Sequence, residues 1–205
     1  MVSREQVLEF VNFCHLVQEK GLVSGPGGNC SCRADDRNIM ITPTGRSLES
    51  LTEEDVVVMD IDGRSAHKLK PSKEHALHRN CYAVRNDVRV VLHVHSVYSV
   101  ALACLKDLDY ACAAPVYTAG YAGRIGNLTT LPYFESGSAA LADGVKQVIA
   151  QRNSVLLANH GLLTVGSSYE QALNLVEEVE ANAQLFFILR EQGRSLDEAK
   201  SGMRA

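Results

Sequence analysis

Two histidines separated by one apolar residue, His93-Val94-His95, offer the clearest chemistry in this sequence. They close the apolar run 89–92, which has the composition of a strand covered on both faces. Side chains alternate faces along a strand, so both imidazoles leave the same side. Two imidazoles in such a place suit a divalent metal of the zinc type. The alternative is two polar residues on the solvated face of an edge strand.

A third histidine and a carboxylate could complete such a site. The apolar run 154–158 delivers His160 at its end, followed by a glycine. Three imidazoles would leave a fourth position open, as in catalytic zinc sites, although a lone turn histidine can equally bond to the backbone. The carboxylate candidate is Glu74, in the first turn of a helix that we expect to start with Ser72 as N-cap. An acid there could also simply favour the helix dipole. His78, one turn further on, could orient the carboxylate.

Three short segments could bind an anion such as phosphate. They are the glycine-rich loop ending in Asn29, the turn containing Thr44 and Gly45, and the helix start at Ser72 and Lys73. Backbone N–H groups in such turns bind anions without a large net positive charge. Glycine, proline and threonine are ordinary turn residues, so each segment carries little weight by itself.

Composition excludes several classes of function. The chain has 205 residues, 46% of them hydrophobic and 21% charged, with a net charge of −4. The negative charge argues against a nucleic-acid partner or an anionic membrane surface. We find no apolar stretch long enough to span a bilayer and no signal-peptide pattern. The six cysteines form no CxxC pair. We therefore expect reduced, mostly buried thiols in a cytoplasmic protein.

Periodicity predicts the elements that position these residues. Helices are expected over 3–21, from 72 onward, near 99–105, over 138–151 and over 168–192, the first and last opened by capping boxes. Strands are expected over 30–33, 39–41, 56–61, 89–95 and 154–158, with a hairpin-like turn at 62–63 and an exposed extended segment over 115–137. This order predicts one α/β domain, residues 1–205, with a central, mainly antiparallel sheet covered by helices.

Five segments in this order resemble the class II aldolase/adducin family: GGN (27–29), ITPTG (41–45), KPSKE (70–74), HVH (93–95) and NHG (159–161). The resemblance runs from about residue 5 to about residue 190. It implies a three-layer α/β/α fold and a homotetramer with active sites at subunit interfaces. It implies that His93, His95 and His160 bind one Zn²⁺ per subunit, which Mn²⁺ or Co²⁺ could replace. It also implies that Glu74 is the acid/base and ligates zinc when substrate is absent.

The activity that the resemblance implies belongs to carbohydrate metabolism. It is a zinc-dependent aldolase, a lyase that cleaves a ketose 1-phosphate to dihydroxyacetone phosphate and an aldehyde via a metal-stabilised enediolate. The sugar phosphate would be held by Asn29, Thr44, Gly45 and Ser72, with Lys73 suited to a phosphate or a substrate carboxylate. In the aldolases a tyrosine of a neighbouring subunit donates a proton. Tyr117 and Tyr121 both lie in the corresponding stretch.

Two departures from the aldolase pattern open alternatives. Aldolases commonly have two serines where this chain has Ser72 and Lys73, and the same PSKE segment resembles the branch that decarboxylates 3-oxo-tetronate 4-phosphates. No aromatic residue follows Phe187, whereas aldolases often contribute an aromatic tail. A pentulose-5-phosphate 4-epimerase is a third reading, and we identify no late acid/base residues for it. A non-enzymatic adducin-like module would be expected to have lost the metal ligands.

Overall fold

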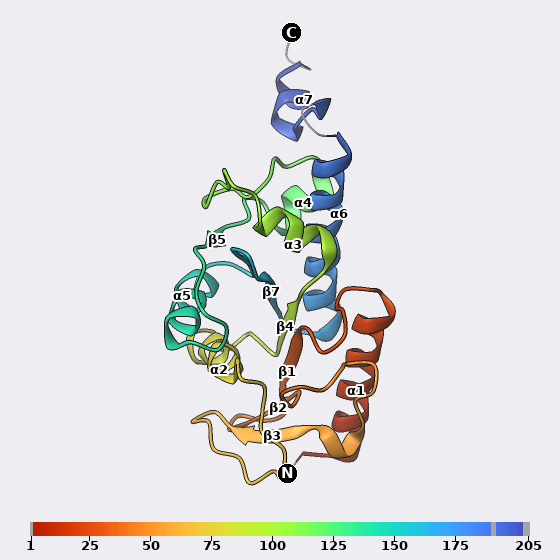
Figure 1. The fold of residues 1–205 in the computed structure, drawn as a ribbon, viewed down its shortest axis with the longest axis vertical. Helices are drawn as coiled ribbons and strands as arrows, with labels where there is room; N and C mark the ends of the chain where they lie inside the picture. Colours follow the sequence, from red (N-terminus) through yellow and green to blue (C-terminus); the bar gives the residue numbers. More distant parts are fainter. Residues whose placement is uncertain (1, 190–191, 203–205) are drawn as a thin grey trace.

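The structure is a computed structural model that describes residues 2–189 and 192–202. Within these residues seven strands form one sheet in the order β3-β2-β1-β4-β7-β6-β5 (Figure 1). The strands are β1 (Asn29–Arg33), β2 (Asn38–Ile41), β3 (Val57–Asp60), β4 (Val90–Val94), β5 (Thr130–Leu131), β6 (Ser154–Leu157) and β7 (Gly161–Gly166). Neighbours run antiparallel except for β5 and β6, which are parallel. The prediction of a mainly antiparallel sheet is confirmed.

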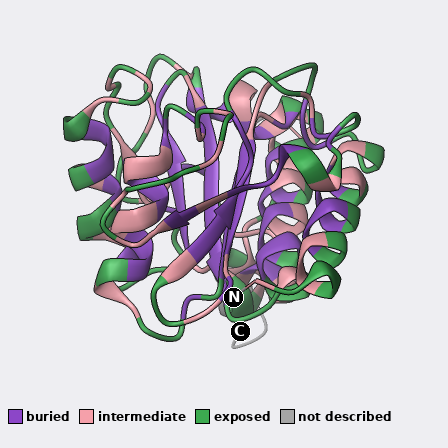
Figure 2. Ribbon diagram, turned by 90° about the horizontal axis from the view of Figure 1, so that it is seen from below, coloured by how far each residue is buried: buried purple, intermediate pink, exposed green. Residues whose placement is uncertain are grey.

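Helices cover both faces of the sheet, as Figure 2 shows from below. They are α1 (Arg4–Glu19), α2 (His75–Val84), α3 (Val97–Ala103), α4 (Ala119–Arg124), α5 (Ala139–Ile149), α6 (Tyr169–Leu189) and α7 (Leu196–Gly202), with the short 3-10 helix η1 (Glu53–Asp55). Apolar residues of α2 and α5 pack on one face of the sheet, and those of α1, α3, α4 and α6 pack on the other. The three-layer α/β/α architecture is therefore confirmed.

Alternation along β4 sets the side on which its histidine leaves the sheet. Val91 packs in the apolar core on the α2 and α5 side, while Val90 and Leu92 pack in the core on the opposite face. His93 is two residues after Val91, so its side chain leaves toward α2 and α5. The two-residue period of a strand thus places this imidazole.

The start of α1 is as predicted, and the start of α2 is not. Ser3 and Gln6 exchange both hydrogen bonds of a capping box. The prediction that Ser72 caps a helix was wrong, because α2 begins at His75. The hydroxyl of Ser72 accepts the N–H of Glu74 and its carbonyl accepts that of His75, which forms a turn before the helix, and the N–H of Ser72 donates to the carbonyl of Thr42 in the neighbouring loop.

Two further expectations need correction. No hairpin forms at 62–63, since β3 pairs only with β2 among the described residues. There the turn is closed by Asp60, whose carboxylate accepts the N–H of Arg64, and no strand follows before α2. The segment 115–137 is not wholly extended and exposed: Thr118 caps α4, and Tyr121 inserts from this helix into the core. The predicted helix end at Gln192 cannot be compared, because positions 190 and 191 lie outside the described residues.

The cysteines agree with the expectation of free thiols. All six are unpaired, and Cys14, Cys30, Cys32 and Cys81 are buried. Cys30 and Cys32 lie in the apolar core on the face of the sheet opposite to α2. Among the described residues, no helix has the length and apolar character that a membrane crossing requires.

Candidate metal centre and active site

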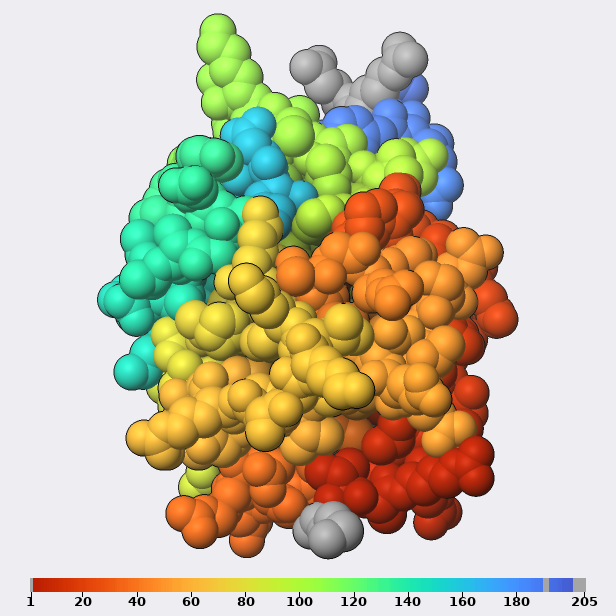
Figure 3. Space-filling model, turned by 60° about the horizontal axis from the view of Figure 1, so that its bottom comes forward, coloured from red at the N-terminus to blue at the C-terminus, as the bar shows by residue number. Residues whose placement is uncertain are grey.

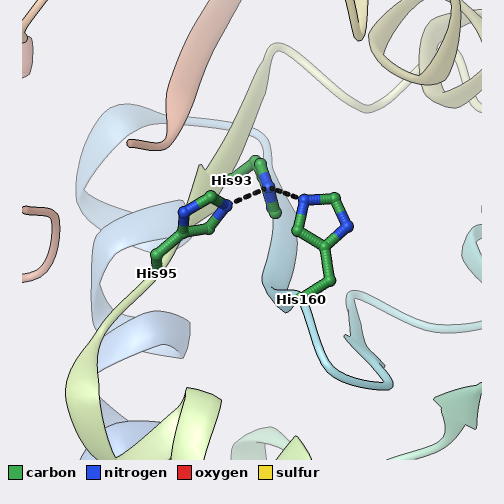
Figure 4. A group of neighbouring side chains, drawn as sticks. All are labelled: His93, His95 and His160. Carbon is green, nitrogen blue, oxygen red and sulfur yellow. Dashed lines mark hydrogen bonds between the residues drawn. The ribbon is translucent and has the colours of Figure 1, made fainter. Parts of the chain in front are cut away.

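Three histidine side chains converge beyond one end of β4 (Figure 4). His93 lies in β4, His95 lies between β4 and α3, and His160 lies in the turn that joins β6 to β7. The Nε2 atom of His93 is 2.9 Å from Nε2 of His95 and 3.3 Å from Nε2 of His160. The three predicted metal ligands therefore form one cluster.

The backbone around His160 explains how the three rings can approach. Asn159 has a φ of 55°, in the left-handed region that asparagine tolerates. Gly161 follows His160 and begins β7. A Cβ atom on Gly161 would lie 2.5 Å from the carbonyl oxygen of Val94 and 2.8 Å from Cδ2 of His95. Only glycine fits at this position without moving β4 or a histidine ring.

The histidines are held in the form that binds metal. Nδ1 of His93 lies 3.0 Å from the carbonyl oxygen of Leu162. A carbonyl only accepts, so Nδ1 carries the hydrogen and Nε2 presents a lone pair to the cluster. Burial lowers the pKa of His93 to about 3 and also lowers the pKa of His95 and of His160. All three rings are therefore neutral at neutral pH, as metal ligands must be.

The spacing and donor set fit a divalent metal. Three nitrogen ligands about 2.0–2.1 Å from a tetrahedral ion lie about 3.3 Å apart. The two Nε2 separations from His93, 2.9 and 3.3 Å, are close to that value. Lone pairs that face each other at such distances repel unless a cation or a proton lies between them. Imidazole donors with a nearby carboxylate suit zinc and its first-row neighbours.

Glu74 supplies that carboxylate from the turn just before α2. It is buried, with an exposed fraction of 3%. Its Oε2 lies 3.5 Å from Nε2 of His93, and its Oε1 lies 3.4 Å from Nε2 of His160. Asn29 donates to Oε2 at 2.8 Å, and the hydroxyl of Ser136 donates to Oε1 at 2.9 Å.

These contacts keep Glu74 ionised. Burial raises the pKa of this carboxyl, whereas the charge that His93 and His160 carry when protonated and the hydrogen bonds from Asn29 and Ser136 lower it, and the pKa lies below its usual value. Since His93 is itself neutral at neutral pH, the two hydrogen bonds are what holds the anion there. The site thus combines three neutral imidazoles with one fixed carboxylate.

A pocket of about 250 Å³ opens beside Glu74 and contains all the predicted phosphate-binding residues. Its lining comprises Pro26, Gly27, Gly28, Asn29, Pro43, Thr44, Gly45, Ser72, Lys73, Glu74, Ser136, His95 and His160. Two of its loops are tied together, because the N–H of Thr44 donates to the carbonyl of Lys70 at 3.1 Å and the N–H of Ser72 donates to that of Thr42 at 3.0 Å. Figure 3 shows the segment around residue 70 (yellow) between the N-terminal segments (orange) and the segment around residue 140 (teal).

Comparison with known proteins agrees with this geometry. Residues 8–187 match the family described as the class II aldolase and adducin N-terminal domain. The chain belongs to the class II aldolase family. A 3-oxo-tetronate 4-phosphate decarboxylase of Haemophilus influenzae is 37% identical over 85% of this chain and 83% of its own length. An L-fuculose phosphate aldolase of Methanococcus maripaludis is 34% identical over 89% of this chain and 97% of its own.

The fold comparison extends the match to nearly the whole chain. The crystal structure of YgbL from Klebsiella pneumoniae superposes with a TM-score of 0.90 and 32% identity, covering 98% of this chain and 99% of that one. The fold of this class II aldolase-family protein is therefore shared along its length. Relatives carry names for two different reactions, so family membership leaves the specific activity open.

The two tyrosines predicted as proton donors do not line the pocket. Tyr121 is 1% exposed and packs in the apolar core between the sheet and α6, where burial raises the pKa of its phenol. Tyr117 is partly exposed, and its backbone N–H donates to the side chain of Asn182 on α6. Of the two, Tyr117 is the more exposed.

One functional neighbour of Glu74 was missed by sequence reasoning. Ser136 contacts Glu74 across 62 positions of the sequence, and nothing in the sequence links it to the carboxylate. His78 was expected as a residue that could orient Glu74, and the structure places its ring against Asn29, which in turn contacts Glu74.

Proposed function

We propose that this class II aldolase-family protein is a zinc-dependent lyase that breaks a carbon–carbon bond beside the carbonyl group of a phosphorylated substrate. The observation that carries the proposal is the meeting of three neutral imidazoles and the ionised Glu74 at a pocket built from anion-binding loops. One Zn²⁺ per subunit would be held by His93, His95 and His160, with Glu74 as a ligand when substrate is absent. Mn²⁺ or Co²⁺ could replace it. When bound, the metal supplies a Lewis acid that stabilises negative charge on the substrate oxygens as the bond breaks.

The protein's own groups bind the substrate and move the proton. Asn29, Thr44, Gly45 and Ser72 would hold the phosphate, since turns of this kind present backbone N–H groups and hydroxyls to an anion. Glu74 lies between this pocket and the histidines, and its carboxylate would carry the proton that the substrate carbon gains after cleavage.

Two reactions named among the relatives give the same carbanion. Loss of carbon dioxide from a 3-oxo-tetronate 4-phosphate and loss of an aldehyde from a ketose 1-phosphate both leave the electron pair on an enediolate of dihydroxyacetone phosphate. Protonation of its carbon then yields dihydroxyacetone phosphate in both cases. The aldol cleavage also requires a base that takes the hydroxyl proton from the carbon that becomes the aldehyde, whereas decarboxylation does not. The two activities therefore differ in that proton, in the fragment that leaves and in what recognises it.

We favour decarboxylation, and the observation that favours it is Lys73. This lysine lines the pocket between Ser72 and Glu74, where it adds a positive charge to the loops that would hold the phosphate. A substrate with both a phosphate and a carboxylate uses that charge, whereas a ketose 1-phosphate has only its phosphate. The 37% identity to a decarboxylase supports the same choice. The aldolase reaction is the second candidate, supported by the aldolase relative that is 34% identical.

The proposal includes the oligomeric state of the protein. We propose that residues 1–205 form one domain and that four copies form a homotetramer with active sites at the interfaces. For the aldolase candidate, Tyr117 would then reach the neighbouring site, where it would take the hydroxyl proton in cleavage and donate it in the reverse reaction, because no tyrosine lines the pocket within the described part of one chain.

Product analysis tests the reaction. Zinc-loaded protein is incubated with 3-oxo-tetronate 4-phosphates and with ketose 1-phosphates, before and after chelation, and carbon dioxide, aldehyde and dihydroxyacetone phosphate are measured together. Decarboxylation predicts carbon dioxide and dihydroxyacetone phosphate in equal amounts, without aldehyde, and only when metal is present. Aldehyde from a ketose 1-phosphate would establish the second candidate. Release of neither fragment by zinc-loaded protein would contradict the lyase proposal.

A matched pair of variants tests the choice of substrate. Lys73→Gln removes the charge and Lys73→Arg keeps it. If Lys73 binds a substrate carboxylate, KM for the 3-oxo-tetronate 4-phosphate should be about 10-fold or more higher in the glutamine variant, as expected for a lost charge-assisted hydrogen bond. The arginine variant stays closer to the native protein. Equal KM values in all three proteins would remove Lys73 from substrate recognition.

A further inference from the structure

A chain of buried polar side chains runs from the interior of the α2 layer to Glu74. The hydroxyl oxygens of Tyr82 and Ser31 lie 2.8 Å apart, and Ser31 Oγ lies 2.7 Å from Nδ1 of His78. Nε2 of His78 lies 2.5 Å from Oδ1 of Asn29, and Nδ2 of Asn29 donates to Glu74. All five side chains are buried, and those of Ser31 and His78 are wholly so.

The direction of every hydrogen bond in this chain follows from the carboxylate at its end. Ionised Glu74 can only accept, so the amide of Asn29 must turn its NH₂ group toward it. The amide oxygen then faces His78, whose Nε2 must carry a hydrogen. A neutral ring protonated at Nε2 leaves Nδ1 as an acceptor, which Ser31 satisfies, and Tyr82 donates to Ser31 in turn. Donation therefore runs in one direction, from the tyrosine to the glutamate.

The other tautomer of His78 would disturb the hydrogen bonds around Asn29. The other tautomer would offer a lone pair at Nε2 and attract the NH₂ group of Asn29. The amide would then turn its oxygen toward Glu74, and two acceptors would face each other in a buried site, which costs free energy. Burial lowers the pKa of His78 to about 4, which keeps the ring in the neutral form that this chain requires.

We propose that His78 is a positioning residue: through its Nε2–H it fixes the amide of Asn29 in the orientation that holds the Glu74 carboxylate between the pocket and the three histidines. The hydroxyls of Ser31 and Tyr82 complete the hydrogen bonding at Nδ1 of His78 from the far side. The ring does not line the pocket, so it acts on the substrate only through Asn29 and Glu74. The expected effect on kcat rests on the proposed function, in which Glu74 carries the proton. The predicted tautomer of His78 is independent of that function.

The first measurement therefore needs no activity. A long-range ¹H–¹⁵N correlation spectrum of the full-length native protein at neutral pH identifies which nitrogen of His78 carries the hydrogen, and a His78→Gln spectrum assigns the signals. The proposal predicts Nε2–H. A ring protonated at Nδ1 would overturn it, whatever reaction the protein catalyses.

The second measurement compares two variants of equal length. The side-chain NH₂ of His78→Gln can take the place of Nε2–H and donate to Asn29, whereas His78→Met fills similar space without a donor. Circular dichroism and thermal unfolding first establish which variants are folded. With zinc-loaded protein, the methionine variant should lose about 10- to 100-fold in kcat with little change in KM. This is the scale typical of residues that hold the side chains of an active site in position. The glutamine variant should recover most of that loss.

The outcomes separate the positioning role from the proposed function. Equal losses of kcat in two folded variants would show that only the imidazole's packing matters and would overturn the proposal. If the methionine variant does not fold, the glutamine variant decides alone. A fall of its kcat by 10-fold or more overturns the positioning role, and a near-native kcat supports that role. If the native protein releases neither product, the proposed function fails while the tautomer measurement still decides the role of His78.

Discussion

Replacing Gly161 with alanine should damage the metal centre through a single methyl group. The added Cβ would lie 2.5 Å from the carbonyl oxygen of Val94, 2.8 Å from Cδ2 of His95 and 3.3 Å from Cε1 of His93. Ordinary contacts between such atoms are about 3.3–4.0 Å, so the overlaps are roughly 0.8 Å or more at the first two atoms. The φ of Gly161 is not in the left-handed region, so backbone strain does not contribute.

The overlap should affect both stability and metal affinity. Overpacking of this kind costs about 1–3 kcal/mol of stability. A metal–nitrogen distance must stay within about 0.2 Å of its normal value. A histidine ring displaced by about 0.5 Å or more exceeds that tolerance, so we expect zinc to bind roughly 100-fold more weakly. Isothermal titration calorimetry with zinc and urea unfolding of the metal-free protein measure the two effects separately.

The control is Gly123→Ala on α4, where an added Cβ meets nothing within 4 Å. This change should leave zinc affinity unaltered and raise stability by about 0.5–1 kcal/mol, as alanine does at an open helical site. If Gly161→Ala binds zinc within a few-fold of the native affinity and unfolds at the same urea concentration, the steric account of this turn is refuted.

Three further predictions use other parts of the site. The pKa of His78 is about 4 in the folded protein against an ordinary 6.5, so the unfolded chain binds more protons between these values and stability falls as pH drops from 6.5 to 4. This contribution is roughly 3 kcal/mol, and urea titrations across that window should show it missing in His78→Gln. Glu180 on α6 accepts hydrogen bonds from Ser96 and from the first turn of α3, directly after His95. Glu180→Gln should therefore cost about 2 kcal/mol in urea unfolding and weaken zinc binding, and native values of both would exclude this anchoring role. Zinc at about 100 times its Kd should stabilise the protein by about 2.7 kcal/mol, which calorimetry would record as a rise in Tm of roughly 5–10 °C that chelation reverses.

Local pattern was sufficient for the parts of the site that lie close together in sequence. The alternation of His93 and His95 on a buried strand depends only on the two-residue period of a strand, so their shared face could be predicted. The capping box at Ser3 and Gln6 is equally local and formed as expected. The order of helices and apolar strands was enough to predict a helix-covered, mainly antiparallel sheet, because each element must bury its apolar face against another.

Predictions failed where a distant contact competed with a local preference. Ser72 is a residue type that favours the N-cap position, and its hydroxyl accepts the N–H of Glu74, but its backbone is paired with Thr42 of another loop and the helix starts three residues later. Tyr121 lies in a stretch rich in glycine and threonine that resembles a surface loop, yet the core admits its ring. Local propensities are worth fractions of a kcal/mol per residue, and burial of a large side chain outweighs them.

The sequence by itself determined which donors the site contains and that two of them share a face. Only the tertiary structure decided how the carboxylate is held, because Asn29 and Ser136 contact it, and His78 contacts Asn29, from separate segments of the chain. Hydrogen bonds act over about 3 Å, and no periodicity in a sequence records which distant side chains the sheet brings to that distance. The fold brings these side chains within that distance by pairing β1 with β4 and packing α2 beside them.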